Sequence, residues 1–89
     1  MKTGIELIAE EREKQISKYG YTPQHDSGYT NEELLQAALA YLKLAAGLGS
    51  TIDWPFDLKY LHDDGYVENL KKAGAFIAAA LDVFQLNNE

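Results

Sequence analysis

The most regular pattern of apolar positions lies in the C-terminal quarter of the chain. One side of residues 66–86 carries small or apolar residues at spacings of three and four, namely Val67, Leu70, Gly74, Ile77, Leu81 and Phe84. This period predicts an α-helix. Much of the other side is also apolar, with Ala73, Phe76, Ala80 and Val83. Such a helix must be buried on most of its circumference, and two other helices in so short a chain cannot cover it. We therefore expect the protein to form a homo-oligomer.

A second helix is predicted near the start of the chain, over residues 3–19. Thr3 and Glu6 have the spacing of a capping box, in which each side chain satisfies a free backbone donor of the other. Gly20 supplies the C-terminal stop. The apolar side of this helix comprises Ile5, Ile8, Ala9, Ile16 and Tyr19. Arg12 interrupts that side and is therefore the most informative residue of the segment.

A third helix is predicted to begin at a second capping box, formed by Thr30 and Glu33. It has a wide apolar face and ends at Gly47 and Gly49. Residues 20–30 and 50–55 are predicted as loops from their composition, and Pro55 suits the first turn of a short helix that runs through about residue 61. We expect an all-α bundle of three main helices plus a short helix, forming a single domain over residues 1–89.

Composition narrows the class of protein. The 89 residues are 46% hydrophobic, enough for a globular core, and include no cysteine, which excludes disulfide frameworks and thiol chemistry. The net charge of −6 argues against a nucleic-acid polymer as partner, because such binders usually carry a basic patch. No stretch approaches the roughly 18 apolar residues of a membrane span. We therefore expect a cytoplasmic protein without a membrane partner.

Three basic residues are candidates for binding an anion. Arg12 lies on an apolar side, where a guanidinium is costly to bury unless it is paired. It either forms an internal ion pair with a carboxylate or binds an anionic ligand. Lys71 borders the apolar stripe of the last helix. Lys71 and Lys72 either pair with Glu68, which precedes them by three and four positions, or contribute to the anion site.

Aromatic residues and a histidine supply candidate contacts to a heterocycle. Asp26 follows His25 and can hold the imidazole in one tautomer and orientation. Beside Tyr21, in a loop rich in tyrosine, this histidine would hydrogen-bond to and stack on a heterocyclic ligand. Trp54 either packs in the core beneath its loop or forms a stacking lid over a base or ribose.

A metal site is the alternative chemistry. Glu10 and Glu13 form an ExxE pair, and two carboxylates one turn apart on a helix can chelate Mg²⁺. The same pair is also typical of a solvated charged face. The sequence contains no Walker loop, no nucleophile elbow and no triad signature, so nucleophilic catalysis has no visible candidate.

Several motifs together resemble a family of small proteins common in bacteriophages and prophages. They are residues 5–15 (IELIAEEREKQ), 20–26 (GYTPQHD) and 31–34 (NEEL) with Ala37, Ala38 and Tyr41, then Trp54-Pro55 and a closing helix with LKKAGAFI. These proteins are similar to MazG-like nucleotide pyrophosphohydrolases. The resemblance implies an all-α fold that assembles as a dimer or tetramer, with Mg²⁺ held between helices by an ExxE and an ExxD pair.

The chain departs from those enzymes at the expected metal ligands. Glu33 is followed three positions later by Gln36, and Glu68 is followed by Lys71 where the ExxD pair is expected. A lysine at that position repels a metal ion and attracts phosphate. The resemblance therefore implies a nucleotide-sized anion site without its metal. It also implies a role similar to that of phage proteins that sequester nucleotide messengers of bacterial immunity without cleaving them.

The leading hypothesis is a small homo-oligomer in the cytoplasm of a bacterial host cell. It binds a nucleotide-derived molecule in a pocket between subunits, as an immune-signal sponge does, without catalysis and without a cofactor. The expected ligand-binding residues are Arg12, Tyr21, His25, Asp26, Trp54, Lys71 and Lys72. One alternative is a MazG-like Mg²⁺-dependent nucleotide pyrophosphohydrolase with Glu10 and Glu13 as metal ligands. A second is a structural or regulatory protein that acts through protein contacts.

Overall fold

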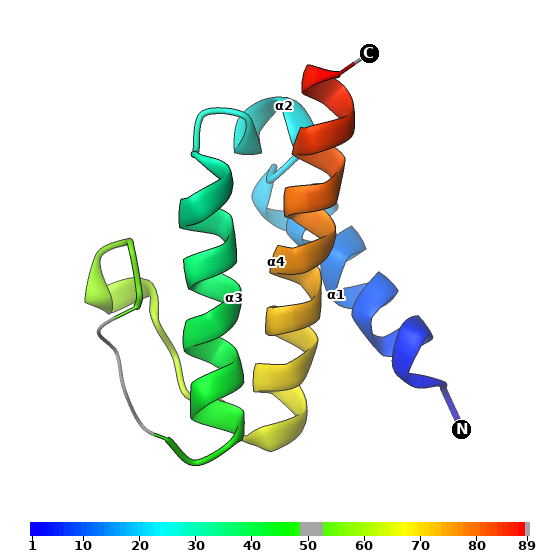
Figure 1. Ribbon diagram of the computed structural model, residues 1–89. Coiled ribbons are helices and arrows are strands. Elements are labelled where there is room, and N and C mark those ends of the chain that lie inside the picture. The colour runs from blue at the N-terminus through cyan, green and yellow to red at the C-terminus, as the bar shows by residue number, and fades with distance from the viewer. Residues whose placement is uncertain (49–52, 89) are drawn as a thin grey trace.

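The computed structural model describes residues 1–48 and 53–88 and shows an all-helical protein (Figure 1). Its elements are α1 (Gly4–Tyr19), α2 (Pro23–Asp26), α3 (Asn31–Ala45), the 3₁₀ helix η1 (Leu58–Tyr60) and α4 (Tyr66–Asn87). The described residues contain no strand. This confirms the prediction of an all-α fold with three main helices.

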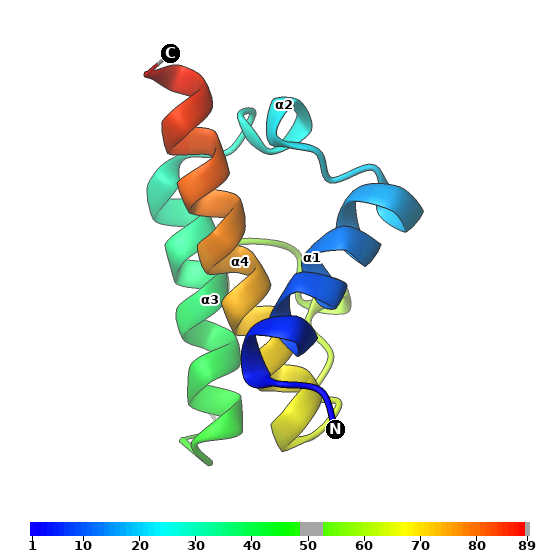
Figure 2. The same ribbon diagram turned by 90° about the vertical axis from the view of Figure 1, so that its right-hand side faces the viewer.

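The helices form an antiparallel hairpin with a third helix laid across it. Helices α3 and α4 run side by side in opposite directions, and α1 crosses α4 obliquely, on the same face of the hairpin as the segment that carries η1 (Figures 1 and 2). The short helix α2 lies near the C-terminal end of α4. The chain between α1 and α3 is thereby placed against α4.

Both predicted capping boxes are present. The Thr3 hydroxyl accepts a hydrogen bond from the Glu6 backbone N–H at 3.2 Å, and the Glu6 carboxylate accepts one from the Thr3 N–H at 3.2 Å. Thr30 and Glu33 make the same pair of bonds at 3.0 and 2.9 Å. Gly20 ends α1 with φ of 74°, a left-handed conformation that glycine adopts without a steric penalty. These local signals fix the helix ends.

Two connecting segments differ from the prediction. The expected loop at residues 20–30 contains α2, because Thr22 caps the His25 N–H at 3.2 Å and Pro23 begins the turn. The helix expected at residues 55–61 is only the three-residue η1. The Trp54 indole N–H donates to the Asp57 carbonyl at 3.0 Å and draws the chain into a turn ahead of η1. Gly49 and residues 50–52 of the loop predicted at residues 50–55 lie outside the described residues.

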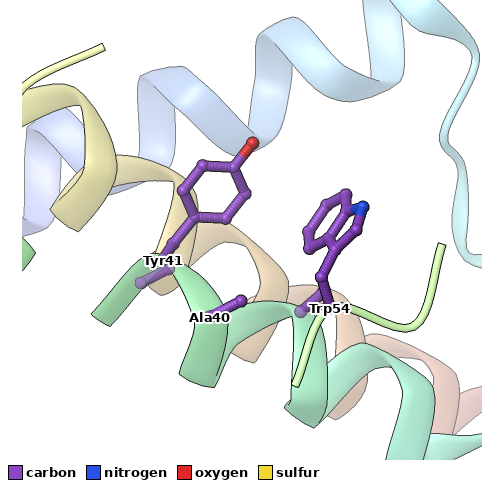
Figure 3. Close-up of a cluster of buried hydrophobic side chains, with 5 residues drawn as sticks. Ala40, Tyr41 and Trp54 are labelled. Carbon is purple, nitrogen blue, oxygen red and sulfur yellow. The ribbon is translucent and has the colours of Figure 1, made fainter. Parts of the chain in front are cut away.

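The core of the hairpin is built from small side chains and stacked aromatic rings. Tyr41 and Trp54 meet edge to face with ring centroids 5.5 Å apart, over the small Ala40 (Figure 3). Phe76 of α4 lies 6.0 Å from the Tyr41 ring and also packs against the cluster around Leu34. Alanines at the α3–α4 contact let the two backbones approach, and the aromatic rings then fill the space beneath the 53–61 segment.

The buried side of α1 is polar, which its apolar pattern did not predict. Glu11, Arg12 and Gln15 are buried, whereas Ile5 is 82% exposed. The helix is held to α4 by the Arg12–Asp82 ion pair and by one close approach, in which Gly74 leaves room for the Ile8 side chain. A Cβ on Gly74 would lie 2.6 Å from the Ile8 Cδ1 atom.

Helix α4 is only partly covered within one chain. Ala73, Ala80 and Val83 are buried, but Ile77, Leu81 and Phe84 remain 42%, 60% and 56% exposed. The expectation that two helices cannot cover all its apolar sides therefore holds for the described part of this chain. None of the described helices combines the length and the hydropathy that crossing a membrane would require.

Candidate functional site

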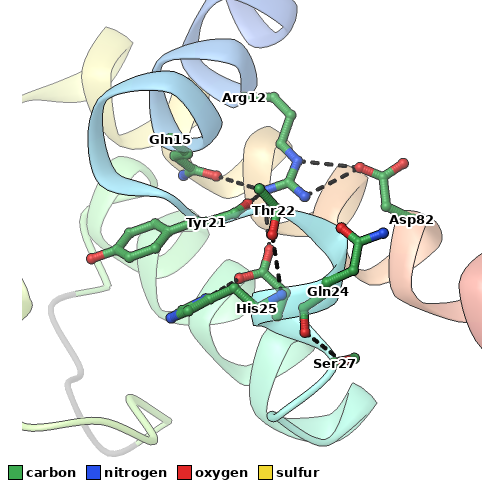
Figure 4. Close-up of polar contacts among 9 residues, drawn as sticks. Arg12, Gln15, Tyr21, Thr22, Gln24, His25, Ser27 and Asp82 are labelled. Atoms are coloured by element: carbon green, nitrogen blue, oxygen red, sulfur yellow. Dashed lines mark hydrogen bonds and ion pairs between the residues drawn. The ribbon is translucent and has the colours of Figure 1, made fainter.

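Arg12 lies at the centre of a network that joins three parts of the chain (Figure 4). Its Nη1 donates to the Asp26 Oδ2 at 3.1 Å, to the Tyr21 carbonyl at 3.0 Å and to the Gln15 Oε1 at 3.3 Å. Its Nε donates to the Asp82 Oδ2 at 3.2 Å. The side chains of Arg12 and Asp26 are only 9% and 6% exposed. The guanidinium is thus engaged by internal partners, as in the ion-pair interpretation of the sequence.

The network continues from Asp26 to His25. The second carboxylate oxygen of Asp26, Oδ1, lies 3.1 Å from His25 Nδ1. A carboxylate that is already paired with Arg12 is a hydrogen-bond acceptor, so it favours the tautomer with the proton on Nδ1. Nε2 lies at the end of the ring away from this contact (Figure 4), and the His25 side chain is 43% exposed. The result is an imidazole held in one orientation at the surface.

Aromatic rings support His25 on both sides. The Tyr21 ring stacks on it with centroids 5.2 Å apart, and the Tyr19 ring stacks on Tyr21 at 5.7 Å. Tyr29 meets His25 edge to face at 5.7 Å. At the outer end of the stack, the Lys18 ammonium lies 5.4 Å from the Tyr19 ring centroid. The exposed His25 stack, defined as Lys18, Tyr19, Tyr21 and His25, therefore presents ring edges and basic nitrogens.

Tyr29 closes the inner side of this stack. Burial raises the pKa of its hydroxyl, and the nearby Tyr21, Asp26 and Glu33 add to the effect. The hydroxyl therefore remains protonated at neutral pH and keeps its capacity to donate a hydrogen bond.

A groove of about 570 Å³ runs between α1 and α4 beside Arg12. Its lining is mainly aliphatic, with polar groups at Arg12, Glu13, Ser17 and Asp82. Because Asp82 neutralises Arg12 and Glu13 adds a negative charge, this groove does not offer a phosphate a net positive surface. A phosphate site is better placed at the His25 stack.

The other predicted ligand-binding residues lie away from Arg12. Trp54 belongs to the core and donates to the Asp57 carbonyl. Lys71 pairs with Glu68 at 3.1 Å, and the Lys72 ammonium pairs with Asp64 and lies 5.4 Å from the Tyr41 ring centroid. The structure thus brings together Arg12, Tyr21, His25 and Asp26, and places Trp54, Lys71 and Lys72 in other contacts.

The residues of the alternative metal site have separate surroundings. The Glu10 carboxylate pairs with Lys2 at 2.7 Å, and Glu13 borders the groove beside Arg12. Within residues 1–48 and 53–88, no group of three histidine or acidic side chains is arranged to hold a metal ion. Glu10 and Glu13 are therefore not joined by a third acidic or histidine ligand within the described part of the chain.

Two residues of the Arg12 network, Gln15 and Asp82, and one of the His25 stack, Lys18, were not identified as site residues from the sequence. Gln15 follows Arg12 by three positions, so helical spacing places both on one side of α1. Lys18 follows Gln15 by the same spacing. Asp82 is 70 residues from Arg12 in sequence, and only the crossing of α1 over α4 brings the two together.

Comparisons of this chain with protein families, with curated proteins and with solved structures find no match.

Proposed function

We propose that the protein binds and sequesters a nucleotide-derived small molecule at the His25 stack, without cleaving it. The observation that supports this most directly is the fixed presentation of His25. Its imidazole is half exposed, held by the buried Asp26, and stacked on Tyr21. A rigid, ordered polar edge among aromatic rings is a common feature of small-molecule sites.

The exposed groups match the chemistry of a nucleotide. His25 Nε2 accepts a hydrogen bond from a base or ribose, and donates to a phosphate when the ring is protonated. Lys18 supplies a point charge for a phosphate at the outer end of the stack. The tyrosine rings offer apolar surface and hydroxyls to the base or ribose. All of these side chains lie in the segment from Lys18 to His25, so each subunit of an oligomer would carry one such stack.

Arg12 acts in this proposal as a positioning residue. Its guanidinium is engaged by Asp26, Asp82 and backbone and amide oxygens, so it does not contact the ligand. By fixing Asp26 it fixes His25. This replaces the direct phosphate contact that the sequence suggested for Arg12.

The test combines ligand capture with mass measurement. The purified chain is equilibrated with a panel of nucleoside mono-, di- and triphosphates and cyclic dinucleotides, separated from free nucleotides and denatured. Mass spectrometry then identifies what is released. We expect an intact nucleotide. A shortened product that accumulates with time would instead support the pyrophosphohydrolase alternative.

Variants of the stack test its location. His25→Ala should weaken binding by about tenfold or more, because a charge-assisted hydrogen bond contributes roughly 1.5–3 kcal/mol. Tyr21→Ala should weaken it about fivefold through lost ring contact. Gln24→Ala, at an exposed neighbouring position on α2, is the matched control and should bind as the wild type does. If no panel member binds, or if His25→Ala binds normally, the proposal is wrong.

A further inference from the structure

A broad apolar face covers one side of the α3–α4 hairpin. It consists of side chains that are each at least 41% exposed, namely Leu35, Leu39 and Leu42 of α3 and Val67, Ile77, Leu81 and Phe84 of α4. Leu42 of α3 and Ile77 of α4 line one groove of about 440 Å³ together with residues of α1, so at this point the two helices present their stripes on the same side. We call these seven residues the hairpin face. His25 and its stack are not part of it.

The hairpin face is large for a chain of this size. Given roughly 150–250 Å² for a fully uncovered aromatic side chain and somewhat less for leucine, the exposed parts of the seven side chains amount to roughly 600 Å². The largest apolar patch of a typical monomer is about 300–600 Å², and a stable protein interface buries about 800 Å² on each partner. The face, with the adjoining groove residues Leu7 and Leu70, approaches the area that a dimer needs.

The spacing on the face indicates what covers it. Leu35, Leu39 and Leu42 are separated by four and then three residues, and Ile77, Leu81 and Phe84 repeat that order. Two such stripes on neighbouring helices form half of a four-helix bundle, in which a second pair of helices with the same spacing fills the seam. A second copy of this chain presents that pair, and an interface between identical copies is self-complementary about a two-fold axis.

We propose that the hairpin face binds a second copy of this chain, so that α3 and α4 of the two subunits pack together as a four-helix bundle.

The test is the mass of the full chain in solution. Light scattering and sedimentation equilibrium at 1–100 µM, roughly the range in which interfaces of this size associate, should give twice the monomer mass of 9.9 kDa. Leu81→Glu should weaken dimerisation by about thirtyfold or more, as expected at the centre of an interface. Because Leu81 is 60% exposed in the single chain, helix content by circular dichroism should not change.

A matched control separates this face from general surface hydrophobicity. Leu58→Glu changes a side chain of η1 that is 61% exposed and lies outside the face, and it should leave the dimer intact. A wild-type mass of 9.9 kDa throughout the range, or a Leu81→Glu variant that still dimerises, overturns the proposal. The result is independent of nucleotide binding, since no residue of the His25 stack belongs to the face.

Discussion

At the scale of single residues, Arg12 has the largest effect on the local structure. Its guanidinium joins α1 to the α2 segment through Asp26 and to α4 through Asp82. Asp26 is almost fully buried, so the ion pair with Arg12 offsets the cost of burying its carboxylate. Arg12 can therefore lie on an apolar side of α1 because tertiary packing brings the carboxylates of Asp26 and Asp82 to it.

Replacing Arg12 should destabilise the fold. Arg12→Ala leaves the Asp26 carboxylate buried without its cation, a change that typically costs about 3–5 kcal/mol in free energy of unfolding. Urea unfolding followed by circular dichroism measures this cost. Lys2→Ala, which removes the exposed pair between Lys2 ahead of α1 and Glu10 on the helix, is the control and should cost less than about 1 kcal/mol. Equal effects of the two changes would show that Arg12 is not a buried anchor.

At the scale of helices, the crossing of α1 over α4 depends on one small residue. Gly74 lies inside α4, where glycine costs about 1 kcal/mol relative to alanine. The Ile8 side chain occupies the space that a Cβ would need, with its Cδ1 and Cγ1 atoms at 2.6 and 2.7 Å from that position. Close approach of the two helices therefore outweighs helix propensity at this position.

A pair of substitutions separates these two effects. Gly74→Ala alone should destabilise the protein, because Ile8 is β-branched and moves only with strain. In an Ile8→Ala background the clash is absent, and the same change should stabilise by about 1 kcal/mol through helix propensity. Thermal unfolding of the four proteins gives the comparison. If Gly74→Ala shifted the melting temperature in the same direction in both backgrounds, α1 would not pack on Gly74.

The start of α4 is held by a pair of charges whose effect depends on pH. The hydrogen bond from Lys72 and its charge lower the pKa of Asp64 below its ordinary value of 3.8. Burial alone would lower the pKa of Lys72. The hydrogen bond to Asp64 and the charges of Tyr41, Asp64 and Glu11 outweigh it and raise the pKa above its ordinary value of 10.5. The Asp64–Lys72 pair therefore stabilises the fold fully between the ordinary pKa values of the two groups, 3.8 and 10.5. This stabilisation is lost as pH falls through the lowered pKa of Asp64, or rises through the raised pKa of Lys72.

This predicts a defined pH profile for Asp64→Asn. The wild type should be more stable than the variant by a constant amount between about pH 5 and pH 9, and the difference should shrink in acid as the pH falls below 3.8 and through the lowered pKa of Asp64. Melting temperatures of both proteins across this range provide the measurement. A difference that grows toward acid pH would contradict the assigned pair.

At the scale of the whole molecule, stability arises from the helical hairpin, the aromatic core and the ion pairs of α1. The described residues supply no metal ligand set that would add to it. Melting temperatures in EDTA and in Mg²⁺ should therefore agree within about 1 °C, whereas a structural metal that binds the native state would raise the melting temperature by several degrees. A large difference that Glu10→Ala or Glu13→Ala abolishes would favour the metal-dependent alternative.

Part of the candidate site could be predicted from the sequence. The contact of His25 with Asp26 follows from adjacency, and Tyr21 lies near because the same short segment carries it. The partner of Arg12 on α4 could not be predicted, since many acidic side chains are available in a chain of net charge −6. Lys71 and Lys72 were grouped with Arg12 by residue type, but their nearest opposite charges, Glu68 and Asp64, hold them elsewhere.

The sequence by itself determined the features that depend on nearby residues. Capping boxes at Thr3 and Thr30, the stop at Gly20 and the period of α4 act within a few residues, so they set the helices whatever their surroundings. The tertiary structure decided which side of each helix is buried. The polar side of α1 faces inward because Asp26 and Asp82 neutralise Arg12 there, and the apolar hairpin face stays exposed because α1 packs on the neighbouring side of α4. These outcomes depend on contacts between distant segments, whose relative placement no local spacing specifies.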